Sequence, residues 1–387
     1  MMSFKVSTIT EEVFEKMKCL KPEFYNEFVC LANRCTYTCC MDWNIHMSKE
    51  EVGRLHEYYG DHLDIHEDGG ATLRFGKDGT CEMMNEEGLC TLYLQHGVEG
   101  ISAVCDTYPR FAIKYDDVQE FHLSNGCEGV LSYFMKRPQL TFLEEDDQPF
   151  KTMIEIYPKE TGMIAARNHA IDLMQIEGIP VWIKLYLVLK YAGGIKACSD
   201  IEGMIRDFSN ESSLRMMAEQ LAGIPDNYSS KFGMFYEMLN SFLPKVREKH
   251  SYELNIKELE SEIPGLLGDT ENLVMEYMEF RKALAQYESY FENVCANYLY
   301  THVEYMFDKD KIEDCVQVLL LQYGITGMST FLKWKRNNKR ISDMDIMHIT
   351  AFFARMMEHG IEVMTEFMDN NSGNEWFTDA GFLTFIR

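Results

Sequence analysis

The spacing of apolar residues changes about one third of the way along this 387-residue chain. In the first third, short runs that alternate apolar and polar residues predict strands. Residues 111–115 and 118–123 flank two aspartates, which predicts a β-hairpin with a tight turn. Residues 72–75 and 81–84 predict a second hairpin around a turn that contains a glycine.

One helix is expected in this first third, at residues 47–59. Ser48 can cap its N-terminus, because a serine hydroxyl accepts a hydrogen bond from a free backbone N–H of the first turn. Three apolar side chains recur at steps of three and four and would form one buried face. They are Val52, Leu55 and Tyr59.

Beyond residue 150 the apolar spacing is helical almost to the end of the chain. Asp269 and Thr270 can cap a long helix whose apolar residues recur at steps of four and three. This face would extend for about seven turns, to Tyr298, at 3.6 residues per turn. Its members are Leu273, Tyr277, Phe280, Leu284, Tyr287, Phe291, Val294 and Tyr298.

Further helices are expected in the same region. Ser342, followed by Asp345 three positions later, has the spacing of a helix N-terminal cap. Residues 180–191 and 312–323 have apolar spacing that fits helices. The pair Gly193-Gly194 follows the first of these and is expected to end it, because glycine is favoured just past a helix C-terminus.

A polar stretch separates the two regions. Pro138, the acidic run 144–147 and Pro149 are typical of an exposed connection. The predicted fold class is therefore α+β. It consists of a small cysteine-rich metal-binding domain with short hairpins, at residues 1–136, and a larger, mainly α-helical domain at residues 150–387.

The charge of the chain limits its partners. With 62 acidic and 37 basic residues, the net charge is −25. A field of this sign repels phosphate backbones and anionic lipid, so neither nucleic acid nor a membrane is an expected partner. It attracts lysine-rich partners, although acidity can also serve solubility alone. The N-terminus does not resemble a secretory signal and the apolar stretches are too short to span a bilayer, so we expect a soluble, cytoplasmic protein.

Cysteine placement gives the first chemical indication. Eight of the twelve cysteines lie between positions 30 and 127. In a cytoplasmic chain, where thiols stay reduced, such clustering favours a metal site over disulfides. Cys295 and Cys315, by contrast, lie in apolar helical patterns and are expected in the core. The eight candidate metal ligands are Cys30, Cys35, Cys39, Cys40, Cys81, Cys90, Cys105 and Cys127.

Spacing leaves the choice of ligands and of metal open. Adjacent side chains diverge, so one of Cys39 and Cys40 could bind a metal while the other packs or serves a second site. By spacing alone, Cys35 with Cys39 and Cys90 with Cys105 are the first choice of four ligands. All-thiolate sites suit both zinc and iron. Neither the C-x2-C spacing of structural zinc nor the C-x3-C-x2-C run of radical enzymes occurs at these cysteines.

In their order along the chain, the cysteine motifs resemble those of the flagellin lysine-N-methylases and of a wider group of zinc- or iron-chelating cysteine domains. The motifs cover residues 28–128, and their joint order is specific, whereas the helical remainder carries no matching motif. Glu128 departs from the family pattern, which has proline directly after the last cysteine. The matching strings are Phe28-x-Cys30-x4-Cys35-x3-Cys39-Cys40-x2-Trp43-x-Ile45, Cys81-x7-Leu89-Cys90, Cys105-x2-Tyr108-Pro109-Arg110-Phe111 and Ser124-x2-Cys127.

The resemblance implies transfer of a methyl group from S-adenosylmethionine to the ε-amine of flagellin lysines. It also implies an iron–sulfur cluster, of the 4Fe–4S type, on the shared cysteines, with zinc as the alternative metal. Methyl transfer is an in-line displacement that needs a neutral amine held close to the methyl group. A nearby tyrosine or carboxylate can assist the loss of the amine proton.

Tyr108 and Arg110, beside Cys105, are the candidate catalytic residues. The alternative interpretation is a structural turn, with the tyrosine in the core and the arginine paired to a carboxylate. No glycine motif of the P-loop or dinucleotide type marks a pocket for S-adenosylmethionine.

Two further functions are compatible with the same residues. One is a non-catalytic metal-binding or electron-transfer module, which would have no reason to bind S-adenosylmethionine. The other is a redox sensor that uses disulfides, which a count of free thiols under reducing and oxidising conditions would reveal. The sequence does not indicate an oligomeric state.

Overall fold

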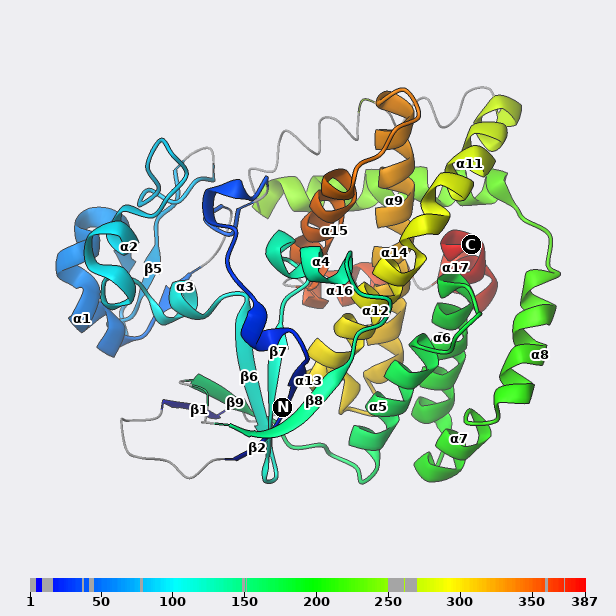
Figure 1. The fold of residues 1–387 in the computed structure, drawn as a ribbon, viewed down its shortest axis with the longest axis horizontal. Helices are drawn as coiled ribbons and strands as arrows, with labels where there is room; N and C mark the ends of the chain where they lie inside the picture. Colours follow the sequence, from blue (N-terminus) through cyan, green and yellow to red (C-terminus); the bar gives the residue numbers. More distant parts are fainter. Residues whose placement is uncertain are drawn as a thin grey trace.

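The chain forms a mixed sheet, a small lobe and a large helical body, as Figure 1 shows. The structure is a computed structural model. The mixed α+β class expected from the sequence is confirmed, with the sheets in the N-terminal part and helices in most of the rest. The structure describes residues 5–8, 17–36, 38–41, 45–76, 79–147, 150, 152–249, 261, 270–358, 361–371 and 373–387.

The larger sheet has the strand order β1-β9-β6-β7-β2-β8. The predicted hairpin at its centre is confirmed, because β6 and β7 pair antiparallel from Arg110 opposite Leu123 to Tyr115 opposite Val118. Parallel pairings join β2 to β7 and β9 to β6. The strands are β1 (Lys5–Thr8), β2 (Met17–Pro22), β6 (Arg110–Tyr115), β7 (Val118–Leu123), β8 (Phe142–Asp147) and β9 (Thr152–Glu155).

The acidic run at 144–147 is largely exposed, as the sequence suggests, but it is a strand rather than a connection. It forms edge strand β8, which pairs antiparallel with β2. Lys21 of β2 is buried and forms ion pairs with Glu145 and, at 2.7 Å, with Asp147. The sheet therefore takes strands from both sides of the predicted boundary, and the division into domains at 1–136 and 150–387 stays a prediction.

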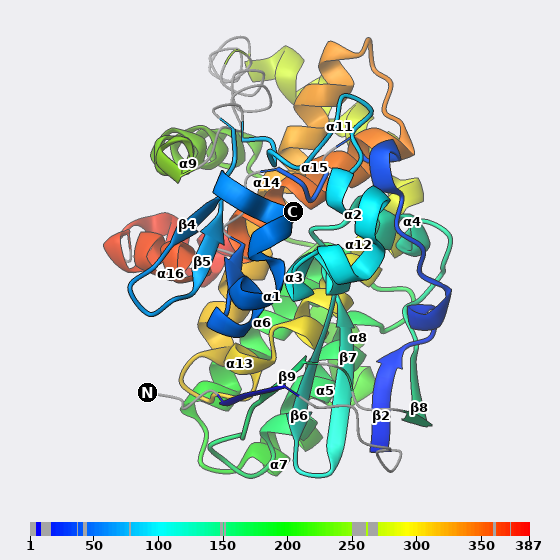
Figure 2. The same ribbon diagram turned by 90° about the vertical axis from the view of Figure 1, so that its left-hand side faces the viewer.

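The small lobe has its own apolar core. Figure 2 shows it facing the viewer, with α1, α2 and α3 in front of the helical body. A three-stranded sheet in the order β3-β5-β4 completes it. Its elements are β3 (His46–Met47), α1 (Lys49–Tyr59), β4 (Leu63–Ile65), β5 (Ala71–Leu73), α2 (Thr91–His96) and α3 (Ala103–Thr107).

Sequence predictions for this lobe are half right. Ser48 caps α1 as expected, since its hydroxyl accepts a hydrogen bond from the backbone of Glu51, and the predicted apolar face is buried. The predicted hairpin of 72–75 with 81–84 forms only in part, as an antiparallel bridge between Phe75 and Cys81. The strand β5 pairs with β3 and β4 instead. The predicted turn includes residues 77 and 78, which lie outside the described residues.

The helical body follows α4 (Glu128–Phe134) and β9. It packs on the large sheet through α12, whose Asn297 side chain donates a hydrogen bond to the Leu123 carbonyl of β7 at 2.9 Å. Its helices are α5 (Met163–Met174), α6 (Val181–Ala197), α7 (Ile201–Asp207), α8 (Glu211–Ala222), α9 (Tyr228–Lys249), α11 (Thr270–Leu284), α12 (Glu288–Thr301), α13 (Val303–Met306), α14 (Ile312–Arg336), α15 (Asp343–Glu358), α16 (Ile361–Asn370) and α17 (Asp379–Ile386).

The long helix predicted up to Tyr298 is two helices. α11 ends at Leu284, a 3-10 turn covers Ala285–Tyr287, and α12 then begins. Asp269, its predicted cap, lies outside the described residues. The predicted cap of α15 is confirmed, because the Ser342 hydroxyl accepts a hydrogen bond from the backbone N–H of Asp345 at 3.1 Å.

α6 does not end at Gly193-Gly194, as predicted, but continues to Ala197. The glycines instead allow close helix packing. A Cβ at Gly194 would lie 2.8 Å from the sulfur of Met204 on α7, and a Cβ at Gly193 would lie 3.0 Å from a carboxylate oxygen of Glu313 on α14.

α14 is the central helix of the body. By length and composition alone it could cross a membrane, but 83% of its most apolar window is buried inside the protein. A helix that is apolar on all sides and enclosed by other helices is typical of a protein core. We therefore interpret α14 as a core helix.

A buried ion pair joins the large sheet to the helical body. Arg167 of α5 contacts Glu120 of β7 through two hydrogen bonds, of 2.5 and 2.9 Å, and both side chains are fully buried. The Tyr115 hydroxyl donates a further hydrogen bond to Glu120 at 2.5 Å. Burial alone would raise the pKa of the Glu120 carboxyl, but the Arg167 guanidinium more than offsets this and the pKa is lowered.

Arg167→Met should lower the free energy of unfolding by about 3–5 kcal/mol, because it leaves the Glu120 carboxylate buried without its counter-ion. Adding Glu120→Gln should restore a large part of this loss, since no unpaired charge then remains. Denaturant titrations followed by circular dichroism would measure both variants.

Arg215→Met is the matched control, since Arg215 pairs with Glu211 on the exposed surface of α8 at 2.6 Å. Its loss should cost less than about 1 kcal/mol. Similar losses for Arg167→Met and Arg215→Met would show that the buried pair does not join the two layers.

Candidate functional site

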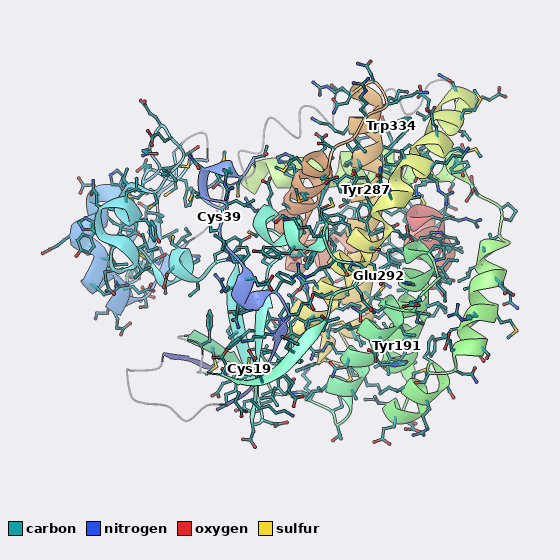
Figure 3. The ribbon with its side chains drawn as sticks, in the orientation of Figure 1. Cys19, Cys39, Tyr191, Tyr287, Glu292 and Trp334 are labelled. Carbon is teal, nitrogen blue, oxygen red and sulfur yellow. The ribbon has the colours of Figure 1, made fainter. Side chains whose placement is uncertain are left out.

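The first four clustered cysteines lie on the segment between the small lobe and the helical body, where Figure 3 labels Cys39. Arg110 of β6 fixes the start of this segment. Its guanidinium donates a hydrogen bond to the Phe28 carbonyl at 2.9 Å. It also lies 4.7 Å from the centre of the Phe28 ring and 5.5 Å from that of Tyr25. These contacts place Cys30 directly after a fixed residue.

Glu128 fixes the middle of the same segment. Its carboxylate is fully buried and accepts a hydrogen bond from the backbone N–H of Thr36 at 2.8 Å. The other carboxylate oxygen lies 3.2 Å from Nδ1 of His348 on α15. The residue that departs from the family pattern thus links Cys35, next to Thr36, to the helical body.

Arg355 of α15 fixes the end of the segment. Its buried guanidinium donates hydrogen bonds of 2.7 Å to the carbonyls of Thr38 and Gly126. Thr38 precedes Cys39, and Gly126 precedes Cys127. One side chain of the helical body therefore holds two cysteine-bearing loops that are far apart in sequence.

The eight cysteines fall into two electrostatic groups. Burial raises the pKa of Cys35 to about 12, and the thiols of Cys127 and Cys30 add to this rise. The pKa of Cys39 is raised first by its hydrogen bond with Cys40 and then by burial, and the Cys127 thiol raises it further. The first group lies on the side of the helical body, beside Arg355. It consists of Cys30, Cys35, Cys39 and Cys127.

The second group belongs to the small lobe. Cys81 is buried, and burial raises the pKa of its thiol to about 12. The thiols of Cys40, Cys105 and Cys90 add to this rise. Its backbone N–H donates a hydrogen bond to the Cys40 carbonyl at 2.9 Å. Cys90 packs against the same core, directly before α2. The group consists of Cys40, Cys81, Cys90 and Cys105.

Adjacent Cys39 and Cys40 therefore belong to different groups. A hydrogen bond between their thiols raises the pKa of Cys39 and lowers that of Cys40. The four ligands favoured by spacing do not come together, because Cys35 and Cys39 lie in the first group and Cys90 and Cys105 in the second.

The cysteines suit a metal in their chemistry rather than in their positions. All twelve are free thiols, and each group offers four of them. Among the residues that the structure describes, however, no three histidine, cysteine, aspartate or glutamate side chains are arranged to hold a metal ion. The thiols of a group would have to move closer together to share a cluster, so the metal-binding character of this region is not confirmed.

The candidate catalytic residues Tyr108 and Arg110 contact other parts of the fold. The Tyr108 hydroxyl is buried, and a Cβ at Gly126 would lie 3.0 Å from it and 2.9 Å from Cγ of Arg355. Burial raises the pKa of Tyr108. Arg110 contacts aromatic rings and a carbonyl rather than the carboxylate of the alternative interpretation. Arg110 positions a cysteine-bearing segment, and Tyr108 is buried beside the loop of Cys127. Their role in the reaction stays a prediction.

Sequence reasoning missed Arg355, His348 and Glu128. Arg355 is a charged residue in the apolar pattern of α15, and this could have marked it as a buried contact. Glu128 was visible only as a departure from the family pattern. Nothing local in the sequence connects either residue to the cysteines, because the contacts join positions 92 and 317 residues apart.

Comparisons with known proteins assign the helical body to a family. A family model described as the FliB lysine N-methylase C-terminal domain matches residues 167–385, more than half of the chain. The lysine-N-methylase of Salmonella typhimurium is 20% identical over 245 residues, which cover 57% of this chain and 60% of that protein. The lysine-N-methylase of Salmonella choleraesuis gives the same figures. The flagellar biosynthetic protein FliU of Salmonella muenchen is 25% identical over 137 residues, which cover 32% of this chain and 81% of that protein.

The matched region begins in α5 and includes α15, which carries His348 and Arg355, whereas all eight clustered cysteines precede it. The chain covers 60% of the length of the two lysine-N-methylases. No solved structure matches it. Because the family match extends over more than half of the chain, this protein belongs to the FliB lysine N-methylase family.

Proposed function

We propose that this protein transfers methyl groups from S-adenosylmethionine to lysine ε-amines of flagellin. Membership of the FliB lysine N-methylase family carries the proposal. The relative FliU is a flagellar biosynthetic protein by name, which supports flagellin as the target. The net charge of −25 also supports a lysine-bearing protein as substrate, because a negative field attracts cationic partners.

We further propose that the clustered cysteines bind an iron–sulfur cluster of the 4Fe–4S type, in the cytoplasm, where thiols stay reduced. Two groups of four free thiols support this proposal. A bound cluster would cross-link turn-rich segments and so contribute to folding. The segments that carry the thiols are already held near one another by Arg355, Glu128 and Arg110. Only a limited movement is therefore needed to bring the thiols together.

The reaction itself needs a neutral amine and a short, aligned path to the methyl carbon. An acidic surface gathers lysines but also raises their pKa, which opposes deprotonation. The target amine therefore has to leave this field before it reacts, and a partly desolvated position favours its neutral form. Binding and chemistry are thus expected at different places on the molecule.

Anaerobically purified protein should be brown and contain iron and acid-labile sulfide. Cys35→Ser should lower the iron content, because Cys35 is a candidate ligand held beside Glu128. Metal analysis and an optical spectrum would measure both. Cys198→Ser is the control, since Cys198 lies outside both groups and its thiol donates to the Ile195 carbonyl at 3.3 Å. A colourless protein with stoichiometric zinc would contradict the iron proposal but not the metal proposal.

The purified protein should methylate lysines of flagellin from its own host when S-adenosylmethionine is supplied. Mass spectrometry of the flagellin would show additions of one methyl mass per modified amine. A flagellin whose surface lysines are replaced by arginine is the control and should stay unmodified. No transfer to any flagellin of the host would end the methylase proposal and favour a non-catalytic metal-binding module.

Tyr108→Phe should change turnover by less than about tenfold, that is by less than about 1.4 kcal/mol in the barrier, because its hydroxyl is buried beside Gly126 and Arg355. Steady-state methylation rates with a parallel iron measurement would test this. A much larger loss at normal iron content would place the hydroxyl in the reaction and restore the catalytic role predicted from the sequence.

A further inference from the structure

The helical body contains a large cavity whose lining includes none of the clustered cysteines. Its volume is about 730 Å³, and its walls come from α6, α9, α11, α12, α14 and the C-terminal residues. Pockets for small molecules span roughly 300–1,000 Å³. Figure 3 labels Glu292 of α12, one of the lining residues, inside the helical body. The cavity thus has room for a ligand of cofactor size.

Lys231 of α9 lines this cavity and is only 4% exposed. Its ammonium group lies 5.2 Å from the centre of the Tyr277 ring. Within the described part of the chain, no carboxylate lies within ion-pair distance of it. Burial and then the charge of Arg281 lower the pKa of Lys231 to about 7. A buried ammonium without a counter-ion is unfavourable unless an anion joins it.

Two arginines increase the positive charge beside Lys231. Arg281 and Arg387 both line the cavity, and both pair with Asp226, at 3.4 and 2.6 Å. One carboxylate therefore serves two guanidinium groups, and its attraction for the Lys231 ammonium is outweighed by burial and by Arg281. Although the cavity lining also contains glutamates, Lys231, Arg281 and Arg387 share one end of it with a single carboxylate, and this cationic end suits an organic anion.

The remainder of the lining has different chemistry. The Glu288 carboxylate accepts a hydrogen bond from the backbone N–H of Val181 at 2.5 Å, and Glu292 pairs with Lys184. Trp182 also lines the cavity, and its ring lies 4.9 Å from the Arg387 guanidinium. The cavity therefore combines a cationic end, two carboxylates and an indole ring.

We propose that this cavity binds S-adenosylmethionine, with the carboxylate of the ligand on Lys231. This inference rests on the proposed function and adds the location of the methyl donor. S-adenosylmethionine carries a carboxylate, an ammonium, a sulfonium and an adenine ring. The Lys231 end matches the carboxylate, and the Glu288 oxygen that does not accept from Val181 matches a cationic group. The face of the Trp182 ring away from Arg387 is offered to the adenine.

Removal of one charge from each partner tests the contact. Titration calorimetry would compare S-adenosylmethionine with its decarboxylated analogue, on the full-length wild-type protein and on Lys231→Met. Lys231→Met should weaken binding of S-adenosylmethionine by about tenfold or more, since a hydrogen bond to a charged group is lost. It should leave binding of the decarboxylated analogue unchanged, because that ligand has no carboxylate for Lys231.

Two controls separate this effect from damage to the fold. Lys231→Met should melt no lower than the wild type, because methionine fills the space without a buried charge. Lys339→Met is the matched variant. Like Lys231, Lys339 lies over an aromatic ring, 5.7 Å from that of Trp334, but its ammonium pairs with Glu279 and it does not line the cavity. The Lys339→Met variant should bind S-adenosylmethionine and its decarboxylated analogue as tightly as the wild type does.

The remaining outcomes decide against the proposal. If Lys231→Met binds S-adenosylmethionine as the wild type does, the methyl donor binds elsewhere, and the methylase proposal stands on its own assay. If affinity for both ligands falls equally, Lys231 acts on the shape of the cavity and not on the carboxylate. If the wild type methylates nothing and binds no S-adenosylmethionine, both the location and the proposed function are wrong.

Discussion

The buried ion pair of Glu120 and Arg167 is the interaction on which the arrangement of the molecule depends. It fixes β7 against α5, and β7 leads directly into the loop that carries Cys127 and into α4. Neighbouring His122 is also fully buried, and burial lowers its pKa to about 3. Its ring is therefore neutral and adds no second positive charge beside Glu120. This compensated pair therefore acts together with the Asn297 contact to hold β7, and with it the loop of the last cysteine, against the helical body.

A second set of buried polar contacts makes the cysteine region and the family domain one unit. Arg355 and His348 belong to the region that the FliB family model matches, yet their partners lie at Thr38, Gly126 and Glu128. Buried polar groups are unfavourable without partners, so neither side of this contact is complete alone. The small lobe, in contrast, has its own core and contributes the second group of thiols.

Local signals were sufficient for the parts of the fold that local chemistry determines. The hairpin of β6 and β7, the Ser48 cap of α1 and the Ser342 cap of α15 all follow from residues a few positions apart. Prediction failed where distant segments decide. β5 pairs with β3 and β4 rather than with its neighbour, and the acidic run becomes a strand because β2 supplies lysines beside it. The candidate ligands were found by clustering, but their division into two groups depends on packing that no spacing rule contains.

The close packing at Gly194 has a consequence for the residues that α6 and α7 can tolerate. A Cβ at this position would lie 2.8 Å from the sulfur and 3.1 Å from the terminal carbon of Met204 on α7. An alanine here would therefore force the Met204 side chain into another conformation, because a packed interior leaves no spare room. The two positions are thus coupled: a larger residue at 194 is expected to need a smaller or rearranged one at 204.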